Sequence, residues 1–169
     1  MIDFTRIKKN VQLSKKSDTL NFMIHYYETF YKIAEPILQN EKYQTLKQFN
    51  QHGKVSTYTH CVHVAYKAYV FNIEHHLGLK DKDVIYAGLL HDYYLYDWHN
   101  KVQKWHGFVH PKIASNNAER DFEISEICKE AIETHMWPLT ITKIPNSKLG
   151  WLITYIDKQC SLYETLFKR

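Results

Sequence analysis

The chain contains few residues that interrupt helices and few cysteines. Only 5 glycines and 4 prolines occur among its 169 residues, so we expect few long loops and a fold dominated by helices. The three cysteines, Cys61, Cys128 and Cys160, form no CxxC pair, which is typical of a reducing, cytoplasmic setting. No apolar run approaches the ~18 residues of a membrane-spanning helix, and no signal peptide is recognisable. We therefore expect a cytoplasmic protein without a membrane partner.

The charge balance is modest for a chain of this length. The net charge is +4 and 24% of the residues are charged, as in an ordinary soluble globular protein. Such a charge permits anionic substrates such as phosphate esters but does not require nucleic acid. Arg6, Lys8, Lys9, Lys15 and Lys16 lie in a stretch of weak periodicity, which favours a solvated basic arm over a nucleic-acid contact. We expect a small-molecule substrate and no nucleic-acid partner.

Apolar residues recur at helical spacing along most of the chain, and no strand pattern of useful length appears. Glu35-Pro36 is expected to end the first helix, and Gly53 the second. Proline suits a first helical position, so Pro111 predicts a new helix with His110 as its cap. The predicted helices cover about 18–34, 36–53, 58–77, 81–95, 111–118, 123–136 and 147–167. The predicted fold class is all-α, a single bundle of about seven helices.

Two of these helices have stripes that are clear enough to predict their inward faces. The stripe of the helix over 123–136 includes Ile127 and ends on His135. The stripe of the last helix includes Tyr163, and Asp157 lies on the same inward side. An ionisable side chain on an apolar stripe calls for a chemical explanation.

The pair His91-Asp92 is the hardest to explain as packing, because both residues lie on the apolar stripe of the helix that they close. Leaving even a neutral polar group unpaired in a core costs about 2–7 kcal/mol. Asp92 therefore needs a metal ion, a buried hydrogen-bond network or a cationic partner. His60 is also predicted to face inward, since it lies one turn before a buried row of its helix. His63 lies close to it on the helix and is an alternative inward-facing histidine.

Six ionisable residues are thus predicted to project inward from several helices. They are His60, His91, Asp92, His110, His135 and Asp157. Four imidazoles and two carboxylates match the ligand preference of Fe, Mn, Zn, Ni or Co, and they suffice for two divalent ions bridged by one carboxylate. His106, one turn before His110, is an alternative to it as a ligand.

The order of these residues resembles a known motif. His60, then His91-Asp92, then Asp157 is similar to the defining pattern of the HD superfamily of metal-dependent phosphohydrolases. The segment HPKIA at positions 110–114 resembles their HPxxG-type segment, with alanine in the glycine position. His135 resembles the further histidine of the dinuclear branches. The whole set is similar to that of bacterial HD hydrolases that split diadenosine tetraphosphate.

The resemblance covers about Leu46 to Glu164 and implies a domain organisation. We expect an HD domain over residues 41–169, preceded by a basic arm and a helix over 1–40, within one compact domain overall. It also implies two divalent metal ions, whose identity among Fe, Mn, Zn, Ni and Co is open. Asp92 would bridge them, with His60, His91 and Asp157 on one ion and His110 and His135 on the other.

The same resemblance implies an activity. We expect hydrolysis of a nucleotide or another small phosphate ester or anhydride by a metal-activated water, since a divalent ion lowers the pKa of bound water toward ~7. The candidate catalytic residues are Asp92, Lys112 and Lys158. The candidate substrate-binding residues are His99, Asp97 and Lys104. Lys101 is a further candidate cation that the sequence does not rank against the other lysines.

Two other functions use the same residues. The di-iron oxygenases that cleave inositol and phosphonates share this fold and a similar ligand set, and a non-catalytic metal- or nucleotide-binding module would also retain it. The pair His91-Asp92 is followed by Tyr93-Tyr94-Leu95 with no nearby lysine, and no Gly-Tyr-Pro segment occurs. Both features argue against the cyclic-dinucleotide phosphodiesterases of the superfamily. The oligomeric state stays open.

Overall fold

The computed structural model describes residues 17–52, 54–97 and 105–167. Within these ranges the chain forms seven α-helices, one 3-10 turn and one short hairpin. The helices are α2 (Ser17–Leu38), α3 (Glu41–Gln44), α4 (Thr57–Glu74), α5 (Asp81–Leu90), α6 (His106–Asp121), α7 (Glu126–Thr134) and α8 (Lys148–Phe167). The turn covers Thr45–Gln48, and β1 (Asn50–His52) pairs antiparallel with β2 (Val55–Ser56). The prediction of an all-α fold with about seven helices is confirmed.

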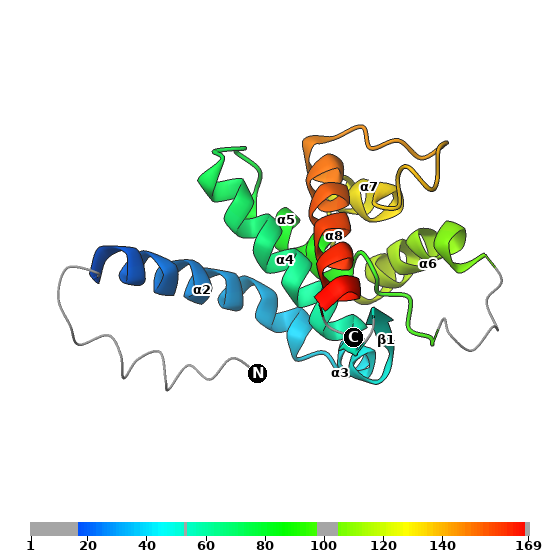
Figure 1. Ribbon diagram of the computed structural model, residues 1–169, viewed down its shortest axis with the longest axis horizontal. Helices are drawn as coiled ribbons and strands as arrows, with labels where there is room; N and C mark the ends of the chain where they lie inside the picture. The colour runs from blue at the N-terminus through cyan, green and yellow to red at the C-terminus, as the bar shows by residue number, and fades with distance from the viewer. Residues whose placement is uncertain (1–16, 53, 98–104, 168–169) are drawn as a thin grey trace.

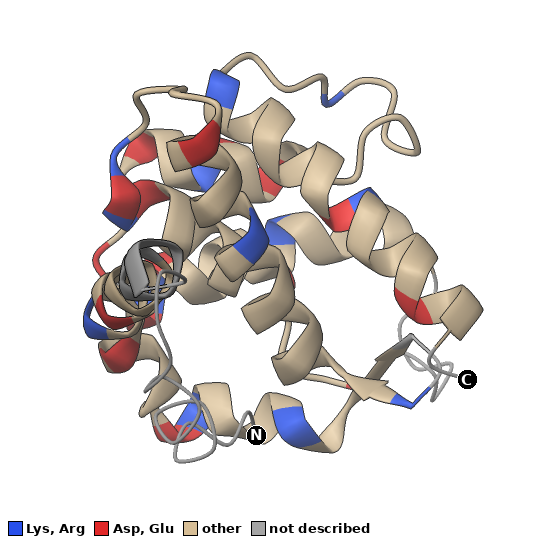
Figure 2. Cartoon of the chain, turned by 60° about the vertical axis from the view of Figure 1, so that its left-hand side comes forward, with Lys and Arg blue, Asp and Glu red and all other residues tan. Residues whose placement is uncertain are grey.

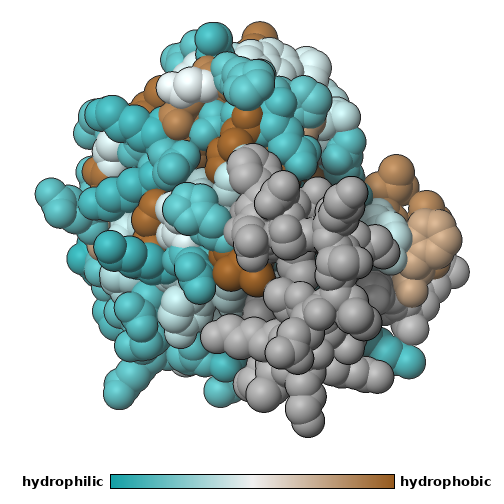
Figure 3. Space-filling model, turned by 90° about the vertical axis from the view of Figure 1, so that its left-hand side faces the viewer, coloured by the Kyte–Doolittle hydropathy of each residue, from teal (hydrophilic) through white to brown (hydrophobic). Residues whose placement is uncertain are grey.

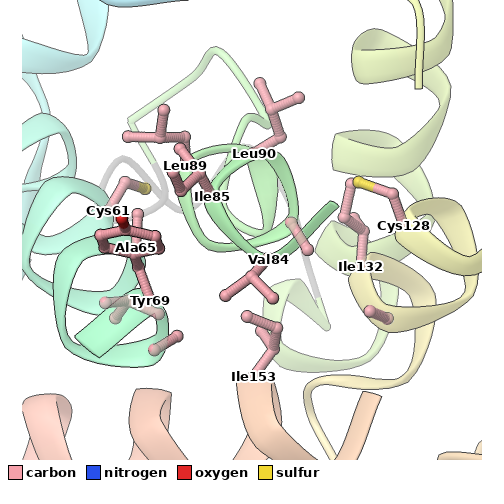
Figure 4. Close-up of a cluster of buried hydrophobic side chains, with 14 of the residues drawn as sticks. Cys61, Ala65, Tyr69, Val84, Ile85, Leu89, Leu90, Cys128, Ile132 and Ile153 are labelled. Carbon is pink, nitrogen blue, oxygen red and sulfur yellow. The ribbon is translucent and has the colours of Figure 1, made fainter. Parts of the chain in front are cut away.

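Helix α5 lies at the centre of the packing. Figure 1 shows α4, α5 and α8 together in the middle of the molecule, with α2 extending to one side and α6 and α7 on the other. In Figure 4 the side chains of α5 occupy the middle of the core, between those of α4 and α7, with Ile153 of α8 beneath them. The labelled core residues are Cys61, Ala65, Tyr69, Val84, Ile85, Leu89, Leu90, Cys128, Ile132 and Ile153. The C-terminal end of this buried helix leads directly into His91 and Asp92.

The N-terminal helix belongs to the same hydrophobic core as the rest of the chain. Tyr26, Phe30, Ala34 and Ile37 of α2 are buried, and the helix contacts α3, α4 and α5. Residues 1–16, which include the predicted basic arm, lie outside the described residues.

The predicted break at Pro36 is wrong. Helix α2 includes Pro36 and continues to Leu38, with the amide of Gln39 donating to the Glu35 carbonyl at 2.9 Å. Proline lacks an amide donor and its ring crowds the carbonyl four residues earlier, but only the last residues of α2 follow Pro36, so little of the helix is affected. The predicted helix over 36–53 is also wrong. The Asn40 side chain caps the short α3 by accepting a hydrogen bond from the Tyr43 amide, and the chain then turns into the hairpin.

Two further helix ends differ from the prediction. Helix α5 ends at Leu90, so the stripe predicted to reach residue 95 is interrupted, and Leu95 adopts a left-handed conformation at φ 61°. Helix α6 begins at His106, which places His110 inside the helix rather than at its cap. The proline at 111 therefore lies in the second turn, where its ring nitrogen donates no hydrogen bond.

Two predicted inward side chains are on the surface. Ile127 of α7 is exposed, and Tyr163 of α8 is 50% exposed. The side chain that α8 buries at that level is Glu164, the next residue. The interior of this part of the fold is therefore more polar than the apolar stripe predicted.

Charged residues on the described surface are mixed in sign. Figure 2 shows basic and acidic segments close together along one edge of the molecule, and ion pairs such as Lys42–Asp121 and Lys129–Glu119 have N–O distances of 2.7 and 2.8 Å. The face seen in Figure 3 is mostly hydrophilic outside the grey residues, with small separate hydrophobic spots. No helix among the described residues is both long enough and apolar enough to span a lipid bilayer.

The close approach of α4 and α5 generates a stability prediction. A Cβ atom added at Gly88 would overlap Ala65 Cα and lie 2.9 Å from the Ala65 nitrogen. Gly88→Ala should lower the free energy of unfolding by about 1–3 kcal/mol, because the backbone of α4 cannot yield as a side chain can. Urea denaturation followed by circular dichroism measures the change.

Gly107→Ala is the matched control for Gly88→Ala. The nearest atom to its added Cβ is the end of the Leu139 side chain, which is about half exposed and can move. Alanine is also favoured over glycine inside a helix by roughly 0.5–1 kcal/mol, so this variant should be unchanged or more stable. Equal stability of both variants would contradict the close packing of Gly88 on Ala65.

Candidate metal centre

Two helices end on a histidine in the same way. His91 follows the last residue of α5, and its Nδ1–H donates to the Gly88 carbonyl at 2.8 Å. His135 follows the last residue of α7, and its Nδ1–H donates to the Ile132 carbonyl at 2.7 Å. The last carbonyls of a helix lack partners within the helix, and a side-chain donor three residues on satisfies one of them. Each imidazole is thus held by its own helix end.

These hydrogen bonds decide what the other ring nitrogen can do. A proton on Nδ1 leaves the lone pair of a neutral imidazole on Nε2, which is the atom that faces the interior. His60 has the same arrangement, because its Nδ1 lies 2.8 Å from Glu164 Oε2, a carboxylate oxygen that can only accept. Three histidines therefore direct Nε2 into the same buried region, and all three side chains are fully buried or nearly so.

The first group of side chains comes from α4, the end of α5, and α8. His60 Nε2 lies 3.1 Å from Asp157 Oδ1 and 3.3 Å from His91 Nε2, and the third side of this triangle measures 3.6 Å. Ligand atoms bound to one ion at about 2.0–2.2 Å lie at comparable separations from one another. These three residues could hold a metal ion.

The second group comes from α6 and the end of α7. His110 Nε2 lies 3.0 Å from His135 Nε2, and both rings are buried. Asp92 Oδ1 lies 3.0 Å from His110 Nε2 and 3.6 Å from His135 Nε2. A second set that could hold an ion, formed by His91, Asp92 and His135, shares His91 with the first.

Asp92 joins the two groups. Its Oδ2 faces the first group, at 3.4 Å from His91 Nε2 and 3.9 Å from His60 Nε2, while its Oδ1 faces the second. Although Oδ1 is buried, it makes no hydrogen bond of acceptable geometry among the described residues. A buried carboxylate oxygen without a hydrogen bond is expensive, and a cation at this position would compensate it.

The pKa values of the clustered side chains also indicate that a cation could bind among them. Burial opposes ionisation of Asp92, but attraction to His91 and the contacts with His110 and His135 together outweigh it and hold the pKa of the carboxyl well below its usual range. Burial also opposes the charge on His91, yet Asp92 and Asp157 raise its pKa to about 10. Burial and the neighbouring His110 lower the pKa of His135 to about 4, so this ring is neutral at pH 7. A metal ion would take the place of the His91 Nε2 proton between the carboxylates, because metal binding releases ligand protons.

The donor set therefore fits divalent metal. The structure brings all six predicted ligands together in the interior, and the two overlapping triads could hold one or more ions. Imidazole nitrogens and carboxylate oxygens without thiolates suit Fe, Mn, Zn, Ni and Co. Of the two rivals on α4, His60 faces the cluster, while the side chain of His63 is 47% exposed.

Three residues that contact the ligands are missing from the sequence predictions: Gln51, Glu164 and Ser161, whose hydroxyl donates to Asp157 Oδ1 at 3.1 Å. Gln51, on β1, donates from its Nε2 to Asp92 Oδ2, and its Oε1 accepts a hydrogen bond from the Tyr94 hydroxyl. The Thr57 hydroxyl also donates to Gln51 Oε1, at 3.3 Å. Two donors on the carbonyl end fix the orientation of the Gln51 amide, so its NH₂ group must face Asp92. No local signal in a predicted helix over 36–53 could have indicated this role.

Glu164 is the second residue that the sequence analysis missed. It is buried on α8 and accepts hydrogen bonds from both His60 and His63. Its position seven residues after Asp157 puts both carboxylates on one face of the helix, which is a signal that the sequence does carry.

Of the two predicted catalytic lysines, Lys158 contacts the cluster and Lys112 does not. Lys158 Nζ donates to Asp157 Oδ2 at 2.7 Å and to the His135 carbonyl at 3.1 Å, so it touches the cluster directly. Lys112 instead pairs with Glu133 at 2.8 Å, and its side chain is 61% exposed. Asp97 is partly buried, after the tyrosines that follow the pair at 91–92.

Several predicted residues cannot be placed. His99, Lys101 and Lys104 lie outside the described residues, as does the side chain of His106. Their roles stay predictions, and so does the choice of His110 over His106, although His110 lies within the cluster.

No family model, curated protein or solved structure matches this chain.

The Gln51 contacts predict a measurable effect in the metal-free protein. Gln51→Ala removes the donor to Asp92 Oδ2 and the acceptor of the Tyr94 hydroxyl, leaving buried polar groups unpaired. The free energy of unfolding in EDTA should fall by about 1–3 kcal/mol. Gln39→Ala, whose amide makes an exposed hydrogen bond to Glu35, should stay within about 0.5 kcal/mol of the wild type. Two equal urea midpoints would contradict the role of Gln51.

Proposed function

We propose that the chain is a metal-dependent phosphohydrolase of the HD type, acting on a nucleotide or another small phosphate ester or anhydride. The observation that carries this proposal is the position of Asp92 between two groups of buried imidazoles. A carboxylate with one oxygen toward each group suits the bridging ligand of a dinuclear centre. The order of the ligands along the chain supplies the phosphate specificity, through its resemblance to the HD superfamily.

The six ligands have distinct roles in this proposal. His60, His91 and Asp157 would hold one ion, His110 and His135 the other, and Asp92 would bridge them. A bound divalent ion lowers the pKa of water toward ~7 and offers a positive charge to phosphoryl oxygens. The carbonyls of Gly88 and Ile132 hold the Nδ1 protons of His91 and His135, so Nε2 of each ring faces inward, and His91 Nε2 would lose its proton when a metal binds. The protein therefore needs little rearrangement to accept the metal.

Lys158 is the described lysine with the strongest claim to a role beside the substrate. Its ammonium group contacts Asp157 and the backbone of His135, and the side chain is 41% exposed. It can therefore balance ligand charge while presenting its charge at the margin of the cluster. Lys112, held by Glu133, would have to leave that ion pair to reach a phosphate. Asp97, His99 and Lys104 remain proposed substrate contacts.

The metal assignment predicts stoichiometry. Purified protein loaded with Mn or Fe should approach two ions per chain by elemental analysis, because two triads are available. His135→Ala should lose one ion, and Asp92→Ala should lose most of both. Asp92→Ala that keeps its full metal content would refute the bridging role. Lys112→Ala, which changes a surface ion pair, is the control that should retain both ions.

The activity prediction uses the same variants. A panel of nucleotides and small phosphate esters should release phosphate or a nucleotide product only when Mn, Fe, Co or a similar ion is supplied. Asp92→Ala should lower the rate by at least ~10²-fold, because it removes the ligand common to both metal positions. Lys158→Ala should have a smaller effect, since it removes only part of the charge stabilisation.

One result would replace this proposal. If fully metallated protein hydrolyses nothing in the panel but consumes O₂ with a polyol or a phosphonate, the site is an oxygenase. A mixed-valent di-iron signal in electron paramagnetic resonance would accompany that outcome. Metal binding without either activity would instead leave a binding module.

A further inference from the structure

His60 differs from His91 and His135 in the group that binds its Nδ1, the ring nitrogen that faces away from the cluster. The Nδ1 atoms of His91 and His135 bond to backbone carbonyls of their own helices. His60 Nδ1 instead bonds to a side chain from another helix, Glu164 of α8, which lies 104 residues later in the chain. Helices α4 and α8 pack against each other near the middle of the molecule (Figure 1). The orientation of His60 thus depends on a contact between two helices.

Glu164 binds two histidines at once. Its Oε2 lies 2.8 Å from His60 Nδ1, and its Oε1 lies 2.9 Å from His63 Nδ1. The carboxylate is only 2% exposed although it is near the end of the chain. The carboxylate is an acceptor, and each of its oxygens has its own imidazole donor.

The two histidines lie on successive turns of α4 but have different surroundings. His60 is fully buried and its Nε2 faces Asp157 and His91, whereas the His63 side chain is 47% exposed. His63 therefore contacts the far oxygen of Glu164 from the solvent side. A carboxylate held at both ends has little freedom to rotate away from His60.

We propose that Glu164 is the positioning residue for the His60 side of the metal centre, and that His63 holds Glu164 in place. Glu164 keeps the proton of His60 on Nδ1 and so keeps the Nε2 lone pair directed at the position shared with Asp157 and His91. The inference rests on the proposed metal centre and extends it to two residues outside the ligand set. Carboxylates that bind the outer nitrogen of a ligand histidine typically change metal affinity by about 10–100-fold when removed.

Glu164→Gln is the sharpest test, because it preserves size while changing the hydrogen-bonding pattern. An amide has one accepting oxygen and one donating NH₂ group, whereas the site presents two N–H donors. Only one histidine can then still donate to the side chain at position 164, so the other must rotate, lose its partner or change tautomer, and the neutral amide oxygen is a weaker acceptor than the carboxylate. Glu119→Gln makes the same chemical change at an exposed ion pair with Lys129 and serves as the matched control.

The measurement is titration of metal-free protein with Zn or Mn, without substrate. Glu164→Gln should weaken one of the two ions by about 10–100-fold and leave the other unchanged, while Glu119→Gln should match the wild type. In zinc-loaded protein with ¹⁵N-labelled histidine, the Nδ1 proton of His60 should move upfield and exchange faster in Glu164→Gln. A purely structural role for Glu164 would not move this signal selectively.

Two results would overturn the inference. Glu164→Gln with wild-type affinity for both ions and an unchanged His60 Nδ1 signal refutes it, while the proposed function stands. Wild-type protein that binds no divalent ion refutes the proposed function and this inference together. If Glu164→Gln does not fold, His63→Ala decides, because it leaves the carboxylate in place. His63→Ala should weaken the same ion by a smaller factor, and unchanged affinity in this variant would count against the proposal.

Discussion

The structure depends on the burial of one carboxylate, Asp92, at the end of the central helix. A side chain that is 2% exposed has lost nearly all contact with water, and an ionised carboxylate in that position must be compensated by the protein or by a cation. Imidazoles from α4, the end of α5, α6 and the end of α7 surround it. The helices therefore pack around a polar centre as much as around an apolar core. Burying these ionisable groups costs folding free energy, and a chemical role for the centre would account for that cost.

Gly88 connects the packing of the helices with the geometry of this centre. Its missing side chain lets α5 lie against the backbone of α4 at Ala65, and its carbonyl accepts the Nδ1 proton of His91. The same residue thus sets the distance between two helices and the direction of one imidazole. The glycine requirement here follows from the close approach, since its backbone does not lie in the left-handed region.

Contacts outside the ligand set explain how the centre keeps its shape. Gln51 on the hairpin fixes one oxygen of Asp92, with its own orientation set by the hydroxyls of Tyr94 and Thr57. Glu164 on α8 performs a similar task for His60. Tyr93, next to the pair His91-Asp92, bonds to Asp121 and accepts from Asn117, which ties α6 to the same segment. The cluster is therefore supported by elements from widely separated parts of the chain.

The sequence by itself determined the helical class from local periodicity, and periodicity together with the family resemblance singled out six ionisable side chains that are buried, although the buried Glu164 was missed. The apolar stripes placed His135 and Asp157 on inward faces, and both side chains are buried, but Ile127 and Tyr163 of the same stripes are exposed, and periodicity alone left His60 and His63 as alternatives. Periodicity did not predict that helix α2 continues past Pro36 or that α6 begins at His106. It also did not predict that Glu164 is buried while Tyr163 is exposed. It also gave no role to Gln51. The burial of Glu164 and the role of Gln51 depend on hydrogen bonds between residues far apart in sequence, such as the 104 positions between His60 and Glu164. Only the tertiary structure brings such partners together, and the free energy of those contacts outweighs the local preference.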